Sequence, residues 1–167
     1  DADALQKGNE SLGLYYQFLG GYQEGTTLFS QATEALQAQP PSEAADRAML
    51  GTRMYEAWYH LRFGRQEGTE ACMAHSQAIY KRLNIPPVPG YLTDPNAPLS
   101  FVALTRGDYK TAVLYAEQVR DVAEAHNHPI NRQFAYHLLS EAYVGLGIYE
   151  TAQKFAQQAY AQSLMTG

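Results

Sequence analysis

Five histidines and one cysteine in this 167-residue sequence invite a search for a metal site or for a catalytic base and nucleophile. His126 and His128 flank one residue at a predicted helix end, a spacing that could ligate a metal only with partners from elsewhere. A solvated loop between helices is the interpretation we favour for this pair. His75 and His137 lie within predicted helices, and no spacing pairs either one with a nucleophile. We therefore expect no metal ion and no other cofactor.

Glycine-rich motifs also fail to indicate a reaction. The stretch "FLGGYQEG", which begins at Phe18, could cradle a phosphate, but it lacks the Lys-Ser/Thr pair that completes a P-loop. The sequence contains no zinc-binding cysteine pair and no nucleophile elbow. We expect a protein that is not an enzyme.

Composition excludes several classes of partner. The net charge is -5 with twelve Lys and Arg residues, which disfavours direct binding of nucleic acid because phosphates are bound by basic side chains. There is no basic amphipathic helix and no run of about 18 apolar residues, so a membrane role has no support. The lone Cys72 cannot form an internal disulfide, and we expect a cytoplasmic location. Because the chain starts without Met and stops just after a helical pattern, we expect a fragment of a larger protein.

The glycines have a simpler explanation, which is an internal repeat. "GYQEGTTLFSQA" at Gly21 resembles "GRQEGTEACMAH" at Gly64, and both then match "GDYKTA" and "GIYETA" further along. One position of the repeat is always Gly or Ala, at Gly25, Gly68, Ala112 and Ala152, with steps of 43, 44 and 40 residues. We call this position the tiny slot. Close packing explains this slot, because Gly or Ala lets an aromatic ring from the partner helix of the hairpin seat against the backbone.

Each repeat is predicted to be a helix, a Gly-containing turn and a second helix. Nine residues before the tiny slot stand Tyr16, Tyr59, Ala103 and Tyr143, and spacings of four on both sides of the turn are helical. The repeats cover about 6–41, 42–84, 93–127 and 128–166. We expect Ser42 to cap one helix and Pro129 to occupy the first position of another. Cys72 aligns with Phe29 of the first repeat and therefore reads as a small core residue.

A proline-rich linker, residues 84–98, lies between the second and third repeats. Its five prolines block helix formation until about Pro95 or Pro98 and shorten the helix that follows. Two interpretations stay open: a rigid spacer that covers an apolar face, or a loop that contacts a ligand through Tyr91.

These repeats resemble the tetratricopeptide repeat (TPR) family. "LGLYYQFLGGYQEGTTLFSQA" matches the family pattern at Leu12, Gly13, Tyr16, Gly20, Tyr22, Phe29 and Ala32, with Gly25 in place of the usual Ala. "LLSEAYVGLGIYETAQKFAQQA" matches at Leu139, Ala142, Tyr143, Gly147, Tyr149, Ala152 and Ala159, whereas the middle repeats are more degenerate. The period exceeds the usual 34 residues and is similar to the long-period arms of bacterial multidomain signal-transduction ATPases and transcriptional activators. The resemblance implies an all-α right-handed superhelix of about four helical hairpins.

The resemblance also implies a concave groove lined by the first helix of each repeat. Groove positions carried over by counting along each repeat are Lys7, Glu10, Gln17, Arg53, His60, Phe101, His137 and Glu141. We consider Arg53 and His60 the best candidates, because they are polar on a helix rich in aromatic residues.

We therefore expect a non-catalytic interaction or sensor module of a regulatory protein, which binds a peptide or a neighbouring domain in this groove. Two alternatives come from other classes: a domain that binds a small-molecule effector, and an oligomerisation scaffold whose end repeats stack on another copy.

Overall fold

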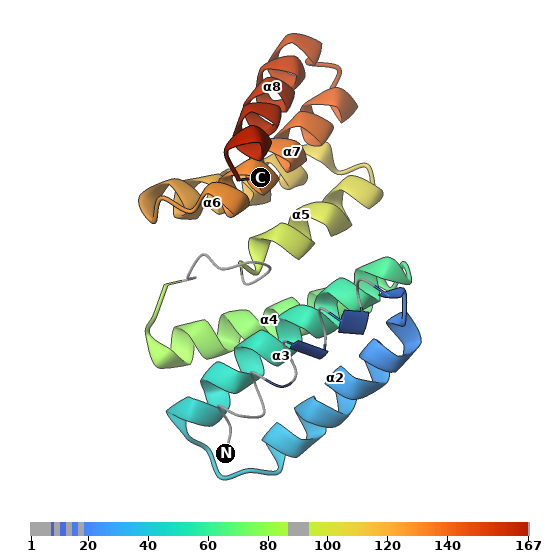
Figure 1. Ribbon diagram of the computed structural model, residues 1–167, viewed down its shortest axis with the longest axis vertical. Coiled ribbons are helices and arrows are strands. Elements are labelled where there is room, and N and C mark those ends of the chain that lie inside the picture. Colours follow the sequence, from blue (N-terminus) through green and yellow to red (C-terminus); the bar gives the residue numbers. More distant parts are fainter. Residues whose placement is uncertain (1–7, 9–10, 13–14, 17–18, 87–93, 167) are drawn as a thin grey trace. The chain divides into compact units, whose positions relative to one another are not determined.

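The computed structural model describes residues 8, 11–12, 15–16, 19–86 and 94–166, and this part of the chain holds seven helices and no strand (Figure 1). The helices are α2 (Tyr22–Gln37), α3 (Glu43–Arg62), α4 (Gln66–Leu83), α5 (Asn96–Thr105), α6 (Tyr109–Ala125), α7 (Pro129–Gly145) and α8 (Tyr149–Thr166). Three hairpins are formed by α3 with α4, α5 with α6, and α7 with α8. The expectation of an all-α protein built from helical hairpins is confirmed.

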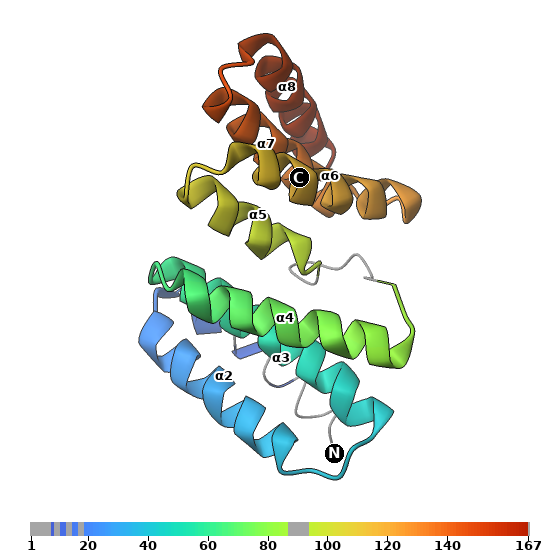
Figure 2. The same ribbon diagram turned by 180° about the vertical axis from the view of Figure 1, so that it is seen from behind.

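The chain divides into two compact units, residues 1–86 and 87–167. In the N-terminal unit, α3 packs against both α2 and α4. In the C-terminal unit, α6 packs against α5 and α7, and α7 also contacts α5 and α8, an order that can be followed from both sides in Figures 1 and 2. The boundary between the units falls inside the proline-rich stretch. The proposed spacer or ligand role of Tyr91 lies outside the described residues, and the repeat boundaries stay a prediction.

The same backbone turn precedes α2, α4, α6 and α8. A glycine with positive φ stands at each turn, and these residues are Gly20 (+74°), Gly64 (+66°), Gly107 (+73°) and Gly147 (+74°). The amide that follows the glycine bonds back to a carbonyl five residues earlier, as from Arg65 to His60 at 2.9 Å and from Ile148 to Tyr143 at 2.9 Å. A left-handed residue is required to reach this carbonyl, and glycine adopts that conformation without a steric penalty.

The helix starts follow from local side-chain chemistry. Ser42 Oγ accepts a hydrogen bond from the Ala45 amide at 3.1 Å, and Pro129 is the first residue of α7, so both predictions are confirmed. His128 caps α7, because its Nδ1 accepts from the Asn131 amide at 3.2 Å. The prolines shorten α5 to 10 residues as expected.

One part of the core of the N-terminal unit is an aromatic stack on a glycine, and an aliphatic cluster of Leu36, Ala48, Met49 and Ile79 is another. Phe29 stacks on Tyr55 with centroids 5.3 Å apart and contacts Tyr59 at 5.6 Å. A Cβ added at Gly25 would lie 2.3 Å from Cζ of Tyr59. The ring beside Gly25 thus comes from the first helix of the next hairpin, since α2 packs against α3, and not from the same hairpin as we expected. At Gly68 the nearest ring is that of His60, from the same hairpin.

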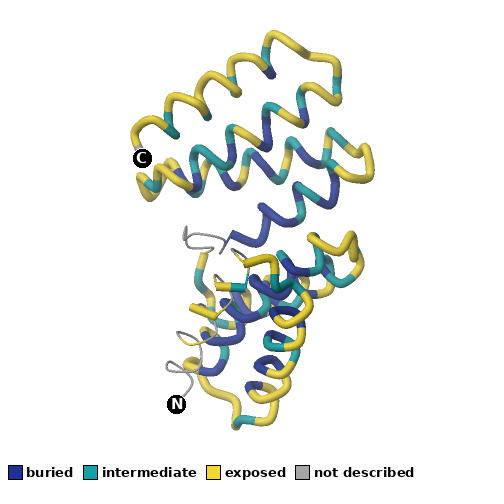
Figure 3. Tube along the Cα trace, turned by 45° about the vertical axis from the view of Figure 1, so that its right-hand side comes forward, coloured by how far each residue is buried: buried dark blue, intermediate teal, exposed yellow. Residues whose placement is uncertain are grey.

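The C-terminal unit packs with small residues instead. Ala112, Ala116, Ala135 and Ala142 are fully buried, and so are Leu138 and Leu139. Burial is uneven: α5 is largely buried, whereas Ala152 is the single buried residue among the described side chains of α8 (Figure 3).

Substitution of Gly25 by alanine is expected to destabilise the N-terminal unit by about 1–3 kcal/mol, because the new methyl group overlaps the Tyr59 ring. Urea unfolding followed by circular dichroism measures this loss. In a Tyr59→Ala background the same substitution should instead be neutral or gain up to about 1 kcal/mol, from the higher helix propensity of alanine. An equal loss in both backgrounds would show that the ring is not the cause.

Asp94 is a buried carboxyl before α5. Its Oδ1 accepts from the Asn96 amide at 2.9 Å, while Oδ2 has no hydrogen-bond partner among the described residues. Burial raises the pKa of this carboxyl despite the bond from Asn96. Asp108, exposed at the start of α6, shows the opposite case: the hydrogen bond from Thr111 lowers its pKa.

The raised pKa predicts a pH-dependent gain for Asp94→Asn. A carboxyl with a folded pKa above its unfolded value weakens folding progressively as the pH rises from about 4, and the uncharged amide removes this cost. We expect a higher unfolding midpoint at pH 7 and a difference that shrinks below about pH 4. Asp108→Asn serves as control and should give no gain at any pH. Equal effects of Asp94→Asn at pH 3 and pH 7 would contradict the assignment.

Candidate functional site

The helix α3 carries polar and aromatic side chains on different faces. Arg53, Glu56 and His60 follow one another at helical spacings of three and four and lie on one face. Trp58, Tyr59 and Arg62 are displaced around the helix. We call the first set, with its neighbours Thr33, Cys72 and His75, the polar cluster. We call the second set, with Tyr22, the aromatic pocket.

Glu56 is the centre of the polar cluster. It is 6% exposed, and its Oε2 accepts from Arg53 Nη1 at 2.7 Å and from Thr33 Oγ1 at 3.3 Å. Its other oxygen, Oε1, lies 3.9 Å from His60 Nε2. A buried carboxylate needs this degree of compensation, because its desolvation is costly without paired donors.

Both histidines of the cluster favour the neutral form. Arg53 Nε donates to His75 Nδ1 at 3.0 Å, which requires an unprotonated nitrogen. Burial and the Arg53 charge lower the pKa of His75. Burial also lowers the pKa of His60, although Glu56 opposes this shift. The Nδ1 atom of His60 is buried, with no hydrogen-bond partner in the described part of the chain.

Cys72 completes the cluster from α4. It is buried, and burial together with the charge of Glu56 raises the pKa of its thiol to about 12. The thiol is therefore protonated and inert as a nucleophile near neutral pH. Its sulfur, one nitrogen of His60 and one oxygen of Glu56 all lie within 4.8 Å of one another.

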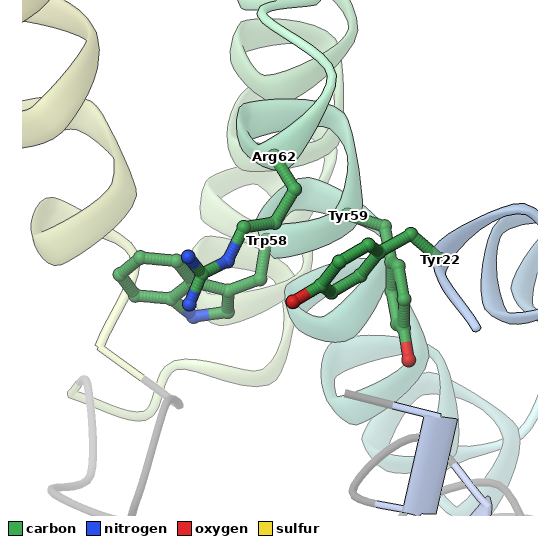
Figure 4. A pocket seen from close by; sticks show the side chains of 4 residues that line it. All are labelled: Tyr22, Trp58, Tyr59 and Arg62. Carbon is green, nitrogen blue, oxygen red and sulfur yellow. The ribbon is translucent and has the colours of Figure 1, made fainter. Parts of the chain in front are cut away.

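The aromatic pocket lies near the C-terminal end of α3 and the start of α2 (Figure 4). Tyr22 and Tyr59 meet edge to face with centroids 6.1 Å apart, and Arg62 Cζ lies 6.0 Å from the Tyr22 ring. Burial raises the pKa of Tyr59 to about 12, so this wall of the pocket is uncharged. Trp58 is the one tryptophan of the sequence. The rings line a small apolar hollow, with a guanidinium at its edge.

A second guanidinium lies next to the pocket. Arg65 Cζ is 5.0 Å above the Phe63 ring, and Phe63 in turn contacts Tyr22 edge to face at 6.4 Å. Arg62 and Arg65 are both exposed. The end of α3 therefore forms a basic, aromatic corner on a chain with a net charge of -5.

The structure divides the predicted groove residues among different surroundings. Arg53 and His60 come together around Glu56, and both lie against α4, through His75 and Gly68 respectively. His137 pairs with Glu141 at 3.5 Å on an exposed face of α7, and Phe101 packs on Phe134 with centroids 5.6 Å apart. The remaining three, Lys7, Glu10 and Gln17, lie outside the described residues. A binding role for the set stays a prediction.

The residues of the predicted packing slots lie mostly inside the helical layers. Gly25, Ala112, Ala152 and Tyr59 are buried, whereas Gly68, Tyr16 and Tyr143 are half-buried. Tyr143 stacks on Phe155 with centroids 5.6 Å apart.

Sequence reasoning missed the aromatic pocket. The available signal was the spacing of Trp58 and Arg62, which stand four residues apart on one helix beside Tyr59. Tyr22 could not be assigned to them, because it comes from the preceding hairpin.

No family model matches this sequence, and no curated protein matches it. Solved structures do. One is a variant of nearly identical TPR-like repeats of a protein assigned as a kinesin light chain from Podosopora anserina, with a TM-score of 0.56, 18% identity and coverage of 96% of this chain and 95% of that chain. The parent repeats match with a TM-score of 0.54 and 18% identity over 99% and 98% of the chains. The fold of this chain is therefore that of TPR-like repeats.

No helix within the described ranges has the length and apolarity needed to cross a lipid bilayer.

Removal of Arg53 is expected to expose the cost of a buried, unpaired charge. Arg53→Met leaves Glu56 without its cationic partner and should destabilise the protein by about 3–5 kcal/mol. The double variant Arg53→Met/Glu56→Met should recover most of this loss, since the charge is removed with its partner. Urea unfolding measures both.

A matched pair on the same helix provides the control. Arg47 and Glu43 form an exposed ion pair at 2.8 Å, and Arg47→Met should cost less than about 1 kcal/mol. The prediction is contradicted if Arg53→Met/Glu56→Met is less stable than Arg53→Met, because the Glu56 carboxylate would then stabilise the protein even without Arg53.

Proposed function

We propose that this chain is a non-catalytic protein-interaction module that binds an extended peptide segment at the aromatic pocket of α3. The observation that carries the proposal is the grouping of Trp58, Tyr22 and Tyr59 around a hollow edged by Arg62. Tryptophan, tyrosine and arginine are the residue types that dominate the energy of protein interfaces. The TPR-like fold supports this role, since stacked helical hairpins present rigid binding surfaces.

The chemistry of the corner defines the partner. The aromatic walls accept an apolar side chain, such as proline or leucine, and Arg62 and Arg65 can pair with a carboxylate beside it. We therefore propose a peptide with an apolar anchor and an adjacent acidic residue. On a chain of net charge -5, this basic corner also directs an acidic segment to one place.

The biological setting that we propose follows from the sequence. The long repeat period is similar to that of regulatory arms in bacterial signalling ATPases and transcriptional activators, and the peptide could come from another domain of the same polypeptide. We propose a cytoplasmic protein with no direct contact to nucleic acid. A sensor role would require the peptide to bind one state of the larger protein more tightly than another.

The test is selection of peptides from a displayed random library against the whole chain, followed by titration with Trp58 fluorescence as the readout. Selected peptides should combine an apolar residue with a carboxylate. Trp58→Ala, measured by calorimetry, should weaken binding by about 30-fold, and Arg62→Glu by about 10-fold or more with reduced salt dependence. Arg47→Glu, on the other end of α3, is the matched control and should bind normally.

Other outcomes identify the alternatives. Loss of binding in Phe101→Ala and Glu141→Lys, with Trp58→Ala unaffected, would move the site to the predicted groove residues of α5 and α7. Thermal stabilisation by one class of metabolite, with no peptide selected, would favour an effector-binding domain. A mass that rises with concentration in sedimentation would favour an oligomerisation scaffold.

A further inference from the structure

Glu56, His60 and Cys72 of the polar cluster occupy slots that the third and fourth repeats fill with small or apolar residues. The equivalents of Glu56, His60 and Cys72, at the repeat offsets, are Ser100, Leu104 and Ala116 in the third repeat and Ser140, Val144 and Ala156 in the fourth. The hairpin fold therefore does not require ionisable groups at these slots. Placing a carboxyl, an imidazole and a thiol together in a buried region costs stability, which calls for a specific role.

We propose that Glu56, His60 and Cys72 form a binding site for a transition-metal ion of the zinc class. One ligand atom from each residue lies within 4.8 Å of the other two. Around a tetrahedral zinc ion, with bonds of about 2.0–2.3 Å, the ligand atoms are roughly 3.3–3.5 Å apart. A contraction of at most about 1.5 Å, through rotation of the side chains, would bring the three atoms into this range.

The hydrogen bonds within the polar cluster are consistent with a metal site. Arg53 and Thr33 donate to Oε2 of Glu56, whereas Oε1 lies 3.9 Å from His60 Nε2, and the Cys72 thiol also interacts with the Glu56 carboxylate. His60 Nδ1 also has no hydrogen-bond partner among the described residues. The imidazole thus packs against Gly68 and lies near the carboxylate, with its Nδ1 atom unpaired as far as the structure describes the chain.

Arg53 has the place of an outer-sphere partner. Carboxylates that bind metals are usually held by a second hydrogen bond, and the 2.7 Å contact from Arg53 fixes the orientation of Glu56 in this way. The two negative charges of thiolate and carboxylate match a divalent cation. On binding, the sulfur–metal bond forms and the thiol proton is released to solvent.

The ligand types define the class of ion. A thiolate with an imidazole selects zinc, cobalt, nickel or copper over magnesium and calcium, which prefer oxygen ligands. Three protein ligands leave a fourth position for water or for a group from a partner.

Titration of the chelator-treated whole chain with Zn²⁺ in a calorimeter tests the site, with Co²⁺ as a spectroscopic probe. We expect one ion per chain, a raised melting temperature and, with Co²⁺, a near-ultraviolet charge-transfer band from the thiolate. The variants replace each ligand with the residue of another repeat, namely Cys72→Ala, His60→Leu and Glu56→Ser, so that the hairpin packing is retained. Each should weaken Zn²⁺ binding by more than about 100-fold, beyond the 10- to 100-fold typical of outer partners.

The surface histidines provide the control. His126→Ala/His128→Ala should bind Zn²⁺ as the unmodified chain does. Absence of stoichiometric binding, a cobalt spectrum without the thiolate band, or affinity that survives Cys72→Ala and His60→Leu would overturn the proposal. Loss of binding in the His126/His128 variant would assign the ion to the chain surface and overturn it equally. Circular dichroism of each variant confirms that the helices are intact.

Discussion

The contact of the Tyr59 ring with the backbone of Gly25 sets how α2 lies on α3, and the N-terminal unit is organised around it. With no side chain at Gly25, the ring reaches the helix backbone and the two axes approach closely. Phe29 then packs on Tyr59, and Tyr22 meets the same ring from its edge. Helix α3 also packs against α4, and Glu56 is buried between Thr33 of α2 and Cys72 of α4. Both the aromatic pocket and the polar cluster depend on this one approach.

Local features of the sequence predicted most of the fold. The glycine turns and the positions filled by Gly or Ala recur once in each hairpin. Ser42, Pro129 and the prolines before α5 set helix starts through interactions within a few residues. These signals need no knowledge of tertiary packing. The repeat period could be predicted from the sequence for the same reason.

The candidate site was less accessible from sequence, because its parts come from different helices. Counting positions along a 34-residue repeat places Arg53 and His60 in a groove, but α3 has 20 residues. In the structure both side chains lie toward α4 and are bound to Glu56 or near it. The pocket joins two hairpins, and the polar cluster joins three helices. Neither grouping follows from spacing along one segment.

The left-handed residues of the turns also divide by chemistry. Within hairpins they are glycine, whereas in two connections between hairpins, those before α5 and α7, Asn84 and Asn127 adopt φ of 52° and 51°. The backbone of glycine is more flexible in the denatured chain, so ordering it costs roughly 0.5–1 kcal/mol more free energy than ordering alanine. Asparagine is less flexible when denatured, but its left-handed backbone is mildly strained in the folded protein. Closing a hairpin and joining it to the next therefore draw on different sources of free energy. The first is opposed mainly by the disorder of the unfolded backbone, and the second by conformational strain in the finished protein.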